Sequence, residues 1–407
     1  MRVIFGPNAS GKSILVSEMR GDFRYLAFRD SYGAADSGYY LQQRWNSCEY
    51  DEVPTVASVL GAVPDGQSGL LEMFGIDSLL DKPVILLSSG ELRKFQLVKA
   101  LLSGVKTLVI DSPFIGLDVE ARIQVGSLLQ RLSAEGGKDI VLVLSREEDI
   151  PVKVDGITRM DTVPEPSCSV EEACAMVSSL GDTVPVSDVV VKLEKVSIRF
   201  GQRTILRDLD WTVRSGEKWA VKGRNGAGKS TLLSIICADI PQAYACDVTL
   251  FGRRRGTGES IWDIKKHIGF VSPELHRAYC RNVSVLDVVA SGLHDRQGMY
   301  LATDPSQVPD CEFWMDVFGI RGLRDRTFTK ISSGEQRLAL LARAFVKDPE
   351  LLILDEPLHG LDNANRARVR AVIEAFCSRR GKTLLMVSHY DDEFPDCITG
   401  TLRLVRQ

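Results

Sequence analysis

The stretch GPNASGKS, residues 6–13, decides the fold, because it returns as GRNGAGKS at residues 223–230. Both copies fit the spacing Gly-x-x-x-x-Gly-Lys-Ser, and each follows a short apolar run, RVIF in the first case and KWAVK in the second. In such a loop the glycines let successive backbone N–H groups point at phosphate oxygens, and the N-terminus of the next helix adds positive potential. The pattern therefore predicts two phosphate-binding loops, each between a strand and a helix.

Two further motifs follow each loop in the same order. LSSGE at residues 87–91 returns as ISSGE at residues 331–335, and IDSPFIGLD at residues 110–118 returns as LDEPLHGLD at residues 354–362. The interval between these motifs is the same in both copies. Agreement of three motifs in order and spacing is far beyond chance and predicts two domains of one kind.

The length of 407 residues suits two domains of about 200 residues each. We expect the first domain at residues 1–160 and the second at residues 188–407. Between them, residues 161–187 contain several Pro and Ser and are expected to be a linker with one short helix at about Val170 to Ser179. Few residues precede the first phosphate loop, so we expect the first domain to be N-terminally shortened and to lack the opening sheet of the second.

The composition argues against several classes of protein. Apolar residues make up 44% and charged residues 26%, as in globular proteins, and the net charge of −4 leaves no basic surplus for nucleic acid. No apolar run approaches the roughly 20 residues that cross a bilayer. The nine cysteines include no C-x-x-C pair, which favours free thiols in a reducing compartment. We expect a cytoplasmic protein, with peripheral attachment to the inner face of a membrane as a variant.

The side chains of the two loops suit a nucleotide and its metal ion. Lys12 and Lys229 are expected to reach the β- and γ-phosphates. Ser13 and Ser230 are expected to bind Mg²⁺ through their hydroxyl groups. A chance glycine-rich turn is the alternative, and its return in register with two other motifs speaks against it. The loop residues expected to bind ATP are Gly6, Pro7, Asn8, Ala9, Ser10, Gly11, Lys12 and Ser13 in the first copy, and Gly223, Arg224, Asn225, Gly226, Ala227, Gly228, Lys229, Ser230 and Thr231 in the second.

Two buried-strand runs end in aspartate, TLVID at Asp111 and LLILD at Asp355. A parallel sheet presents such a carboxylate at its C-terminal edge, where ligands bind. We expect both aspartates to hold Mg²⁺, directly or through water. An aspartate that merely caps a turn is the alternative, and the fixed spacing to the SSGE motif disfavours it.

The residue after each aspartate differs between the copies. Glu356 is the candidate general base for the water that attacks the γ-phosphate. Ser112 stands in its place in the first copy and is neither basic nor charged at pH 7. At the end of the following strand, His389 is expected to contact the γ-phosphate, and the first copy has Arg146 there. The sequence therefore predicts hydrolysis in the second copy and a non-hydrolytic nucleotide site in the first.

One aromatic residue is a candidate for the nucleotide base. Phe200 precedes the second phosphate loop on an expected strand and is placed to stack on an adenine face. An ordinary core phenylalanine fits the same pattern, and both interpretations stay open.

The order of these motifs resembles that of the ATP-binding cassette (ABC) ATPases over nearly the whole chain. Within that superfamily, the segment TLFGRRRGTGESIWDIKKHIGFVS at residues 249–272 and the twin arrangement resemble the tandem cassettes named for molybdate transport. The resemblance implies an α/β fold with two tandem nucleotide-binding domains. Each would combine a P-loop NTPase core with a helical subdomain that carries the SSGE signature.

The resemblance also implies how the domains work together. The two cassettes of one monomeric chain would face head to tail and sandwich two ATP molecules, each on one phosphate loop and beneath the other domain's signature. The second loop, with Asp355, Glu356 and His389, would form the hydrolytic site, and the first loop with Asp111 would form the other. The signature residues implied to cover ATP are Ser88, Ser89 and Gly90 over the second loop, and Ser332, Ser333 and Gly334 over the first.

One departure from the family pattern concerns the partner. ABC domains usually place a Gln in the loop that meets a membrane permease, whereas this chain has Pro273 and Glu274 in the second copy and no Gln in YLAFRDSYG at residues 25–33 of the first. A separate permease, perhaps for molybdate in the family's terms, is therefore one expected partner. The alternative is a soluble twin-cassette ATPase that acts on a macromolecular assembly, although such proteins carry a long basic linker. A third hypothesis is a nucleotide sensor that hydrolyses little ATP. The presence of Glu356 and His389 argues against it.

Overall fold

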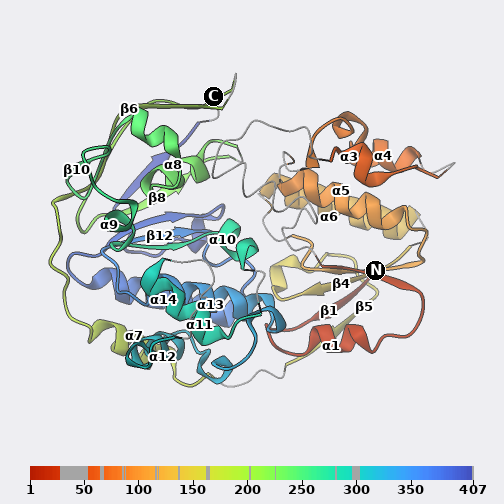
Figure 1. Cartoon of the computed structure of the whole chain (residues 1–407). Coiled ribbons are helices and arrows are strands. Elements are labelled where there is room, and N and C mark those ends of the chain that lie inside the picture. Colours follow the sequence, from red (N-terminus) through yellow and green to blue (C-terminus); the bar gives the residue numbers. More distant parts are fainter. Residues whose placement is uncertain are drawn as a thin grey trace. The chain divides into compact units, whose positions relative to one another are not determined.

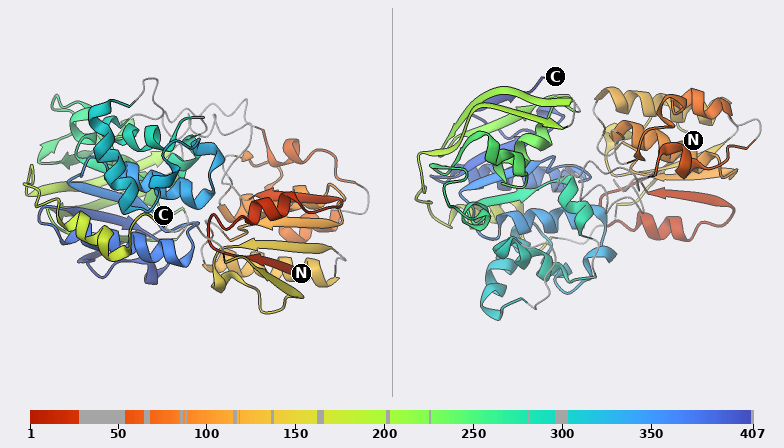
Figure 2. Two further views of the ribbon diagram at one scale, coloured as in Figure 1. Left: turned by 90° about the horizontal axis from the view of Figure 1, so that it is seen from below. Right: turned by 45° about the horizontal axis from the view of Figure 1, so that its top comes forward.

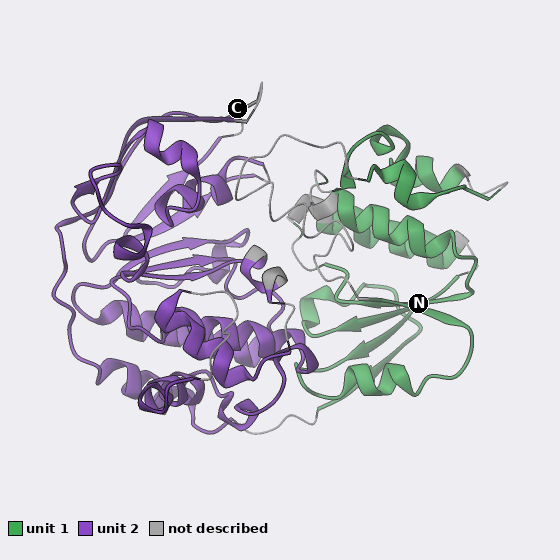
Figure 3. Ribbon diagram, in the orientation of Figure 1, with its two compact units in different colours: residues 1–43, 47–164 green, residues 44–46, 165–407 purple. Residues whose placement is uncertain are grey.

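The computed structural model of the chain describes residues 1–27, 54–64, 68–84, 87, 89–114, 117, 119–135, 138–161, 166–200, 203–224, 226–279, 282–295 and 303–405. The chain forms two compact units, one of residues 1–43 with 47–164 and one of residues 44–46 with 165–407 (Figure 3). Each unit has a hydrophobic core of its own.

The first unit is built on a parallel sheet of five strands in the order β2-β3-β4-β1-β5 (Figure 1). Its strands are β1 (Arg2–Phe5), β2 (Phe23–Ala27), β3 (Thr107–Asp111), β4 (Asp139–Leu144) and β5 (Gly156–Arg159). Its helices include α1 (Lys12–Ser17), α3 (Val56–Leu60), α4 (Ser68–Phe74), α5 (Ser89–Leu101) and α6 (Val119–Glu135). Each phosphate-loop and aspartate motif therefore lies at the end of a strand in one sheet.

The second unit repeats this sheet as β11-β12-β13-β8-β14, again with all neighbours parallel. The strands are β8 (Lys218–Lys222), β11 (Ile268–Val271), β12 (Leu351–Asp355), β13 (Thr383–Val387) and β14 (Gly400–Arg403). Because β1 and β8 both carry a phosphate loop and β3 and β12 both end in aspartate, the two units have the same strand order. The internal repeat expected from the sequence is confirmed in the fold.

The second unit also has an antiparallel sheet of order β10-β9-β6-β7. Its strands are β6 (Val189–Phe200), β7 (Arg203–Arg214), β9 (Asp247–Leu250) and β10 (Arg253–Arg254). The long hairpin of β6 and β7 is clearest in the right view of Figure 2. The opening sheet expected in the second domain is thus confirmed. Among the described residues of the first unit there is no corresponding antiparallel sheet.

The helices of the second unit cover both faces of its parallel sheet. They are α7 (Val170–Ser178), α8 (Lys229–Ile236), α9 (Ile261–Lys265), α10 (Pro273–Ala278), α11 (Val285–Ala290), α12 (Val308–Val317), α13 (Ser333–Phe345) and α14 (Asn363–Ser378). Successive side chains of a strand point to opposite faces. On β12, Leu351 and Ile353 join the core that contains α8, whereas Leu352 and Leu354 join the core that contains α13 and α14. Burial on both faces explains why this strand is continuously apolar.

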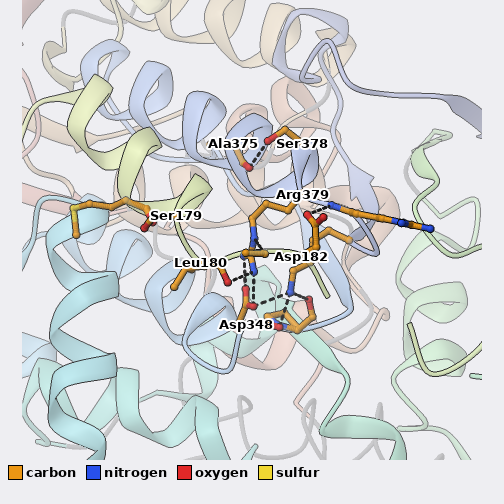
Figure 4. Close-up of polar contacts among 12 residues, drawn as sticks. Ser179, Leu180, Asp182, Asp348, Ala375, Ser378 and Arg379 are labelled. Carbon is orange, nitrogen blue, oxygen red and sulfur yellow. Dashed lines mark hydrogen bonds and ion pairs between the residues drawn. The ribbon is translucent and has the colours of Figure 1, made fainter. Parts of the chain in front are cut away.

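Of the linker expected at residues 161–187, the part at residues 166–187 packs on the second unit. The predicted short helix is confirmed as α7, which begins with a capping box between Ser169 and Glu172 and contacts α14 and α12. Beyond α7, Arg379 at the end of α14 donates a hydrogen bond from Nε to the carbonyl oxygen of Gly181. Its two Nη atoms form a two-point ion pair with Asp348 (Figure 4). These contacts fasten the segment to the core over most of its length.

No helix in the described ranges is both long enough and apolar enough to cross a bilayer.

Candidate functional site

The phosphate loop of the second unit joins β8 to α8. Gly228 is the N-cap of α8 with φ 92°, and Gly226 has φ 76°, a backbone conformation that favours glycine. A Cβ on Gly223 would lie only 2.8 Å from the carbonyl oxygen of Leu404. The Nζ atom of Lys229 is buried in the loop and donates to the carbonyl oxygen of Gly223 at 2.6 Å. The lysine is thereby held at the helix N-terminus, where an anion would bind.

The first unit has the same loop between β1 and α1. Gly11 is the N-cap of α1 with φ 87°, and Lys12 Nζ donates to the carbonyl oxygen of Gly6 at 2.6 Å. Ala9 takes the place of Gly226 and keeps a left-handed φ of 62°. Such a conformation costs a residue with a Cβ on the order of 1 kcal/mol. The loop geometry therefore survives the change from glycine to alanine.

The remaining loop residues lie around these lysines. Ser13 and Ser230 are exposed and occupy the second position of α1 and α8, so their hydroxyl groups lie at the two helix N-termini. Ser10 Oγ is buried and, within the described part of the chain, has no hydrogen-bond partner, which suits a group that meets a phosphate oxygen. Asn225 lies outside the described residues. Of the other predicted residues, Pro7, Asn8, Arg224 and Ala227 lie in the loops, and Thr231 is the third residue of α8.

The two strand-end turns share one backbone geometry. Glu356, directly after Asp355 at the end of β12, has φ 49°, and its N–H donates to the carbonyl oxygen of Val387 at 2.9 Å. Ser112, directly after Asp111, has φ 53°, and its N–H donates to the carbonyl oxygen of Val143 on β4 at the same distance. Both turns therefore present the next side chain at the carboxyl edge of the sheet, but only one presents a carboxylate.

In the second unit this carboxylate meets two histidines. Glu356 Oε1 lies 2.9 Å from His389 Nε2, and Glu356 Oε2 lies 3.8 Å from His359 Nδ1. Burial alone raises the pKa of Glu356. The hydrogen bond from His389, followed by the charge of His359, outweighs burial and lowers the pKa to about 2. So acidic a group accepts hydrogen bonds well and accepts a proton poorly, which suits it better for orienting a water molecule than for deprotonating it.

In the first unit the strand-ending carboxylate, that of Asp111, accepts hydrogen bonds from two hydroxyl groups. Tyr25 on β2 donates to Asp111 Oδ2 at 2.6 Å, and the Ser112 hydroxyl donates to Asp111 Oδ1 at 2.8 Å. Arg146, in the place of His389, lies with its Nε 3.5 Å from Glu148. A metal ion at Asp111 would share the carboxylate with these two hydroxyl groups. The sequence did not indicate Tyr25, because only the pairing of β2 with β3 brings it there.

The oxygen donors of the second unit fit a magnesium ion. Asp355 is buried at the end of β12, and Ser230 lies at the start of α8. Hydroxyl and carboxylate oxygens are hard ligands, and Mg²⁺ is usually held by one or two of them together with substrate phosphates. Among the described residues no group of three or more His, Cys, Asp or Glu is arranged so that it could hold a metal ion, so a complete protein cage is not expected there.

The signature of the second unit lies at the start of α13. Ser332 is the N-cap, its Oγ accepts the N–H of Glu335 at 3.3 Å, and Glu335 Oε2 accepts the N–H of Ser332 at 2.7 Å. Ser333 and the buried Gly334 form the first turn, so their backbone N–H groups face the helix N-terminus. In the first unit, Ser89 and Gly90 open α5, and Ser88 lies outside the described residues.

Two other expectations concern segments next to this site. Phe200 ends β6, and its side chain lies outside the described residues, as do residues 28–32 of the first copy. At the segment of the second copy that lacks the family's usual Gln, Ser272 is the N-cap of helix α10 and Pro273 is its first residue. His276 of this helix lies with its Nε2 2.8 Å from Gln336 Oε1 on α13. The sequence did not indicate this contact.

Comparison with known proteins gives one consistent result. Residues 206–359 match the family described as ABC transporter. The chain is 42% identical to the ABC transporter ATP-binding protein ModF of Escherichia coli K12 in an alignment 359 residues long, which covers 83% of this chain and 73% of ModF. It is 29% identical to an uncharacterized ABC transporter ATP-binding protein of Schizosaccharomyces pombe, over 80% of this chain and 69% of that protein.

A solved structure matches nearly the whole chain. It is the archaeal ribosome recycling factor aABCE1 in complex with the archaeal ribosomal stalk protein aP1, with a TM-score of 0.50 and 18% sequence identity. The match covers 96% of this chain and 80% of that one. At this identity the likeness concerns the fold, and it agrees with two tandem cassettes.

The lowered pKa of Glu356 predicts how acid acts on stability. A carboxyl group whose folded pKa lies below its unfolded value of about 4.3 stabilises the fold above that pH. This contribution is lost as the pH falls from there towards about 2. The urea unfolding free energy of the wild type should therefore fall more steeply between about pH 5 and pH 3 than that of Glu356→Gln. Parallel curves for the two proteins would contradict the assignment.

Proposed function

The chain belongs to the ABC transporter family of ATP-binding proteins, and from this we propose that it is an ATPase that binds ATP and Mg²⁺ on both cassettes and hydrolyses ATP mainly on the second. One observation carries the proposal. Glu356 and His389 lie 2.9 Å apart beside the second phosphate loop, whereas the first unit has Ser112 and Arg146 at these positions.

Binding rests on the loop and its helix. The nine-tenths buried Lys229 and the N-terminus of α8 supply positive charge for the β- and γ-phosphates. Ser230 and Asp355 offer the oxygens that hold the metal. When bound, Mg²⁺ neutralises charge on the phosphate oxygens. ATP would thus be fixed with its terminal phosphate towards the carboxyl edge of the sheet, where β12 and β13 end.

The hydrolytic step rests on Glu356 and His389. With its pKa lowered to about 2, Glu356 is ionised at neutral pH and can accept a hydrogen bond from the attacking water. His389 Nε2 holds the carboxylate on one side and lies at the end of β13, next to the same edge. We propose that it keeps the carboxylate aligned and contacts the γ-phosphate when ATP is bound. Positioning of this kind supplies most of the catalysis in phosphoryl transfer.

The first cassette is proposed to bind ATP without hydrolysing it. Its loop keeps the lysine and the N-cap glycine Gly11, so phosphate contacts are available. Ser112 supplies no base, and Asp111 is engaged by two hydroxyl groups. We propose that ATP joins the two cassettes of one chain, each nucleotide being covered by the other cassette's signature. The intact SSGE motif of both copies supports this pairing.

Two kinds of partner remain proposals. One is a separate membrane permease, of the molybdate type if the sequence resemblance extends to the substrate. The other is a soluble macromolecular assembly. The second unit favours the soluble assembly slightly. Ser272 and Pro273 begin the helix α10 where permease-coupled cassettes usually carry their Gln. The contact of His276 with Gln336 gives this segment a connection to the signature helix that needs no membrane protein.

The first prediction tests the role of Glu356. Glu356→Gln should lower the ATPase rate by at least about 100-fold, because it removes the charged acceptor for the water. ATP binding should persist, since the loop contacts are unchanged. Phosphate release and the binding of labelled ATP measure the two effects. A mutant that hydrolyses at nearly the wild-type rate would show that Glu356 is not the catalytic carboxylate.

A second prediction tests the difference between the two cassettes. Lys229→Ala should abolish hydrolysis, because it removes the phosphate contact of the hydrolytic site. Lys12→Ala should reduce the number of nucleotides bound and slow turnover only indirectly, through weaker pairing of the cassettes. Single-turnover hydrolysis and the stoichiometry of bound nucleotide separate these effects. Equal chemical steps in both cassettes would contradict the proposal.

A third prediction concerns the partner. Cross-linking of the tagged protein in its native host, followed by fractionation, should recover it without any multi-spanning membrane protein. Glu356→Gln is the better protein for this experiment, because it should keep ATP bound and so prolong the complex with the partner. Enrichment of one multi-spanning membrane protein in the cross-linked sample would instead support transport.

A further inference from the structure

A buried arginine connects the signature helix to the catalytic turn of the second unit. Arg337 lies on α13 and is only 2% exposed. Its Nη2 donates to the carbonyl oxygen of Asp355 at 2.9 Å and to that of Glu356, and its Nε donates to the carbonyl oxygen of Pro357 at 3.4 Å. One guanidinium therefore contacts three successive carbonyl groups. A planar, forked donor is suited to this, and a lysine ammonium is not.

The turn that it contacts is strained. Glu356 has a left-handed φ of 49°, which costs a residue with a Cβ on the order of 1 kcal/mol and persists only where the surroundings hold it. On one side the hydrogen bond from the Glu356 N–H to Val387 holds the turn against β13. On the other side Arg337 holds its carbonyl groups. Because the Glu356 side chain leaves this peptide directly, a rotation of the turn would redirect the carboxylate.

The first unit contains the same arrangement of residue types. Arg93 occupies the place of Arg337 on α5 and is fully buried, and Ser112 has the same left-handed φ as Glu356. Arginine is rarely buried without strong hydrogen bonds, because the charge is costly to desolvate. The same residue type thus occupies the equivalent position of α5 and α13.

The position of Arg337 on α13 adds a second consequence. The helix begins with the signature residues Ser332 to Gly334, one turn before Arg337. Gln336, next to Arg337, donates to the carbonyl oxygens of Phe328 and Ile331 and so anchors the same turn of the helix. A displacement of the signature would therefore move the guanidinium with it.

We propose that Arg337 is a positioning residue that orients Glu356 for hydrolysis and transmits the state of its own cassette's signature to the catalytic turn. The inference rests on the proposed ATPase function of the second cassette. In the proposed sandwich, the signature of the second cassette covers the ATP of the first. Occupancy of the non-hydrolytic site would thus reach Glu356 through one side chain.

Substitution of Arg337 tests the positioning role. Arg337→Met should lower kcat by about 10- to 100-fold, the loss expected from a small misplacement of a catalytic group, with the affinity for ATP changed by less than about twofold. The kcat of Arg337→Lys should lie between those of Arg337→Met and the wild type, because lysine keeps the positive charge but lacks the forked guanidinium. Steady-state kinetics, ATP binding and thermal unfolding are measured on each full-length variant.

Two matched controls separate positioning from packing. Arg343→Met removes another buried arginine from α13, one that donates to Tyr279 and Ser291 and does not contact the turn. Arg93→Met removes the counterpart on α5 of the first unit. Both should leave kcat within about threefold of wild type at temperatures where they are folded. A loss in Arg343→Met equal to that in Arg337→Met would overturn the positioning role.

A double-mutant cycle tests the transmission. Ser332→Ala removes the helix cap at the signature and should slow turnover in the wild-type background. In the Arg337→Met background it should slow turnover much less, because the connection is already cut. If Ser332→Ala lowers turnover by the same factor in both backgrounds, the proposed transmission through Arg337 is overturned.

The outcomes distinguish this inference from the function on which it rests. Absence of turnover in the wild type, or undiminished turnover in Glu356→Gln, would contradict the ATPase proposal. Wild-type kcat in a folded Arg337→Met protein would overturn only the role of Arg337. If Arg337→Met does not fold, Arg337→Lys provides the test. A folded lysine variant with the wild-type kcat would show that the forked guanidinium is not needed to position Glu356.

Discussion

The left-handed turn after the strand-ending aspartate is the constraint on which the second cassette depends. With φ 49° at Glu356, the chain leaves β12 so that successive carboxylates, those of Asp355 and Glu356, lie at one edge of the sheet. A relaxed extended backbone would place them on opposite faces. The turn is held by a strand on one side and a helix on the other, so the catalytic geometry is a property of the packed unit.

The first cassette shows that this geometry and the chemistry are separable. Its turn has φ 53° and the same hydrogen bond to the neighbouring strand, yet it presents a hydroxyl group. That hydroxyl, with the one of Tyr25, engages Asp111. A nucleotide site without a catalytic carboxylate can still bind ATP, and in the proposed pairing it can still help to close the sandwich. One such site per chain would make the conformational response to ATP asymmetric.

The segment between the cassettes contributes to the second one in a similar, local manner. Arg379 donates to the chain beyond α7, and Arg368 of α14 donates to the carbonyl oxygens of Cys168 before α7 and of Val317 on α12. Both arginines are buried. They hold α7 against α14 and α12, and thus join the parallel-sheet core to the helical layer that carries the signature.

Residue type and short-range spacing are enough to predict the repeat, the phosphate loops, the strands that end in Asp111 and Asp355, the helix α7, and the contrast between Glu356 and Ser112, because a single sequence displays them. The contacts of Glu356 with His389 and His359, of Tyr25 with Asp111, and of Arg337 with the turn after β12 appear only in the folded chain. These contacts join residues that are distant in the chain or lie on different elements. They depend on strand order and on how helices pack against the sheet, and no local pattern records either.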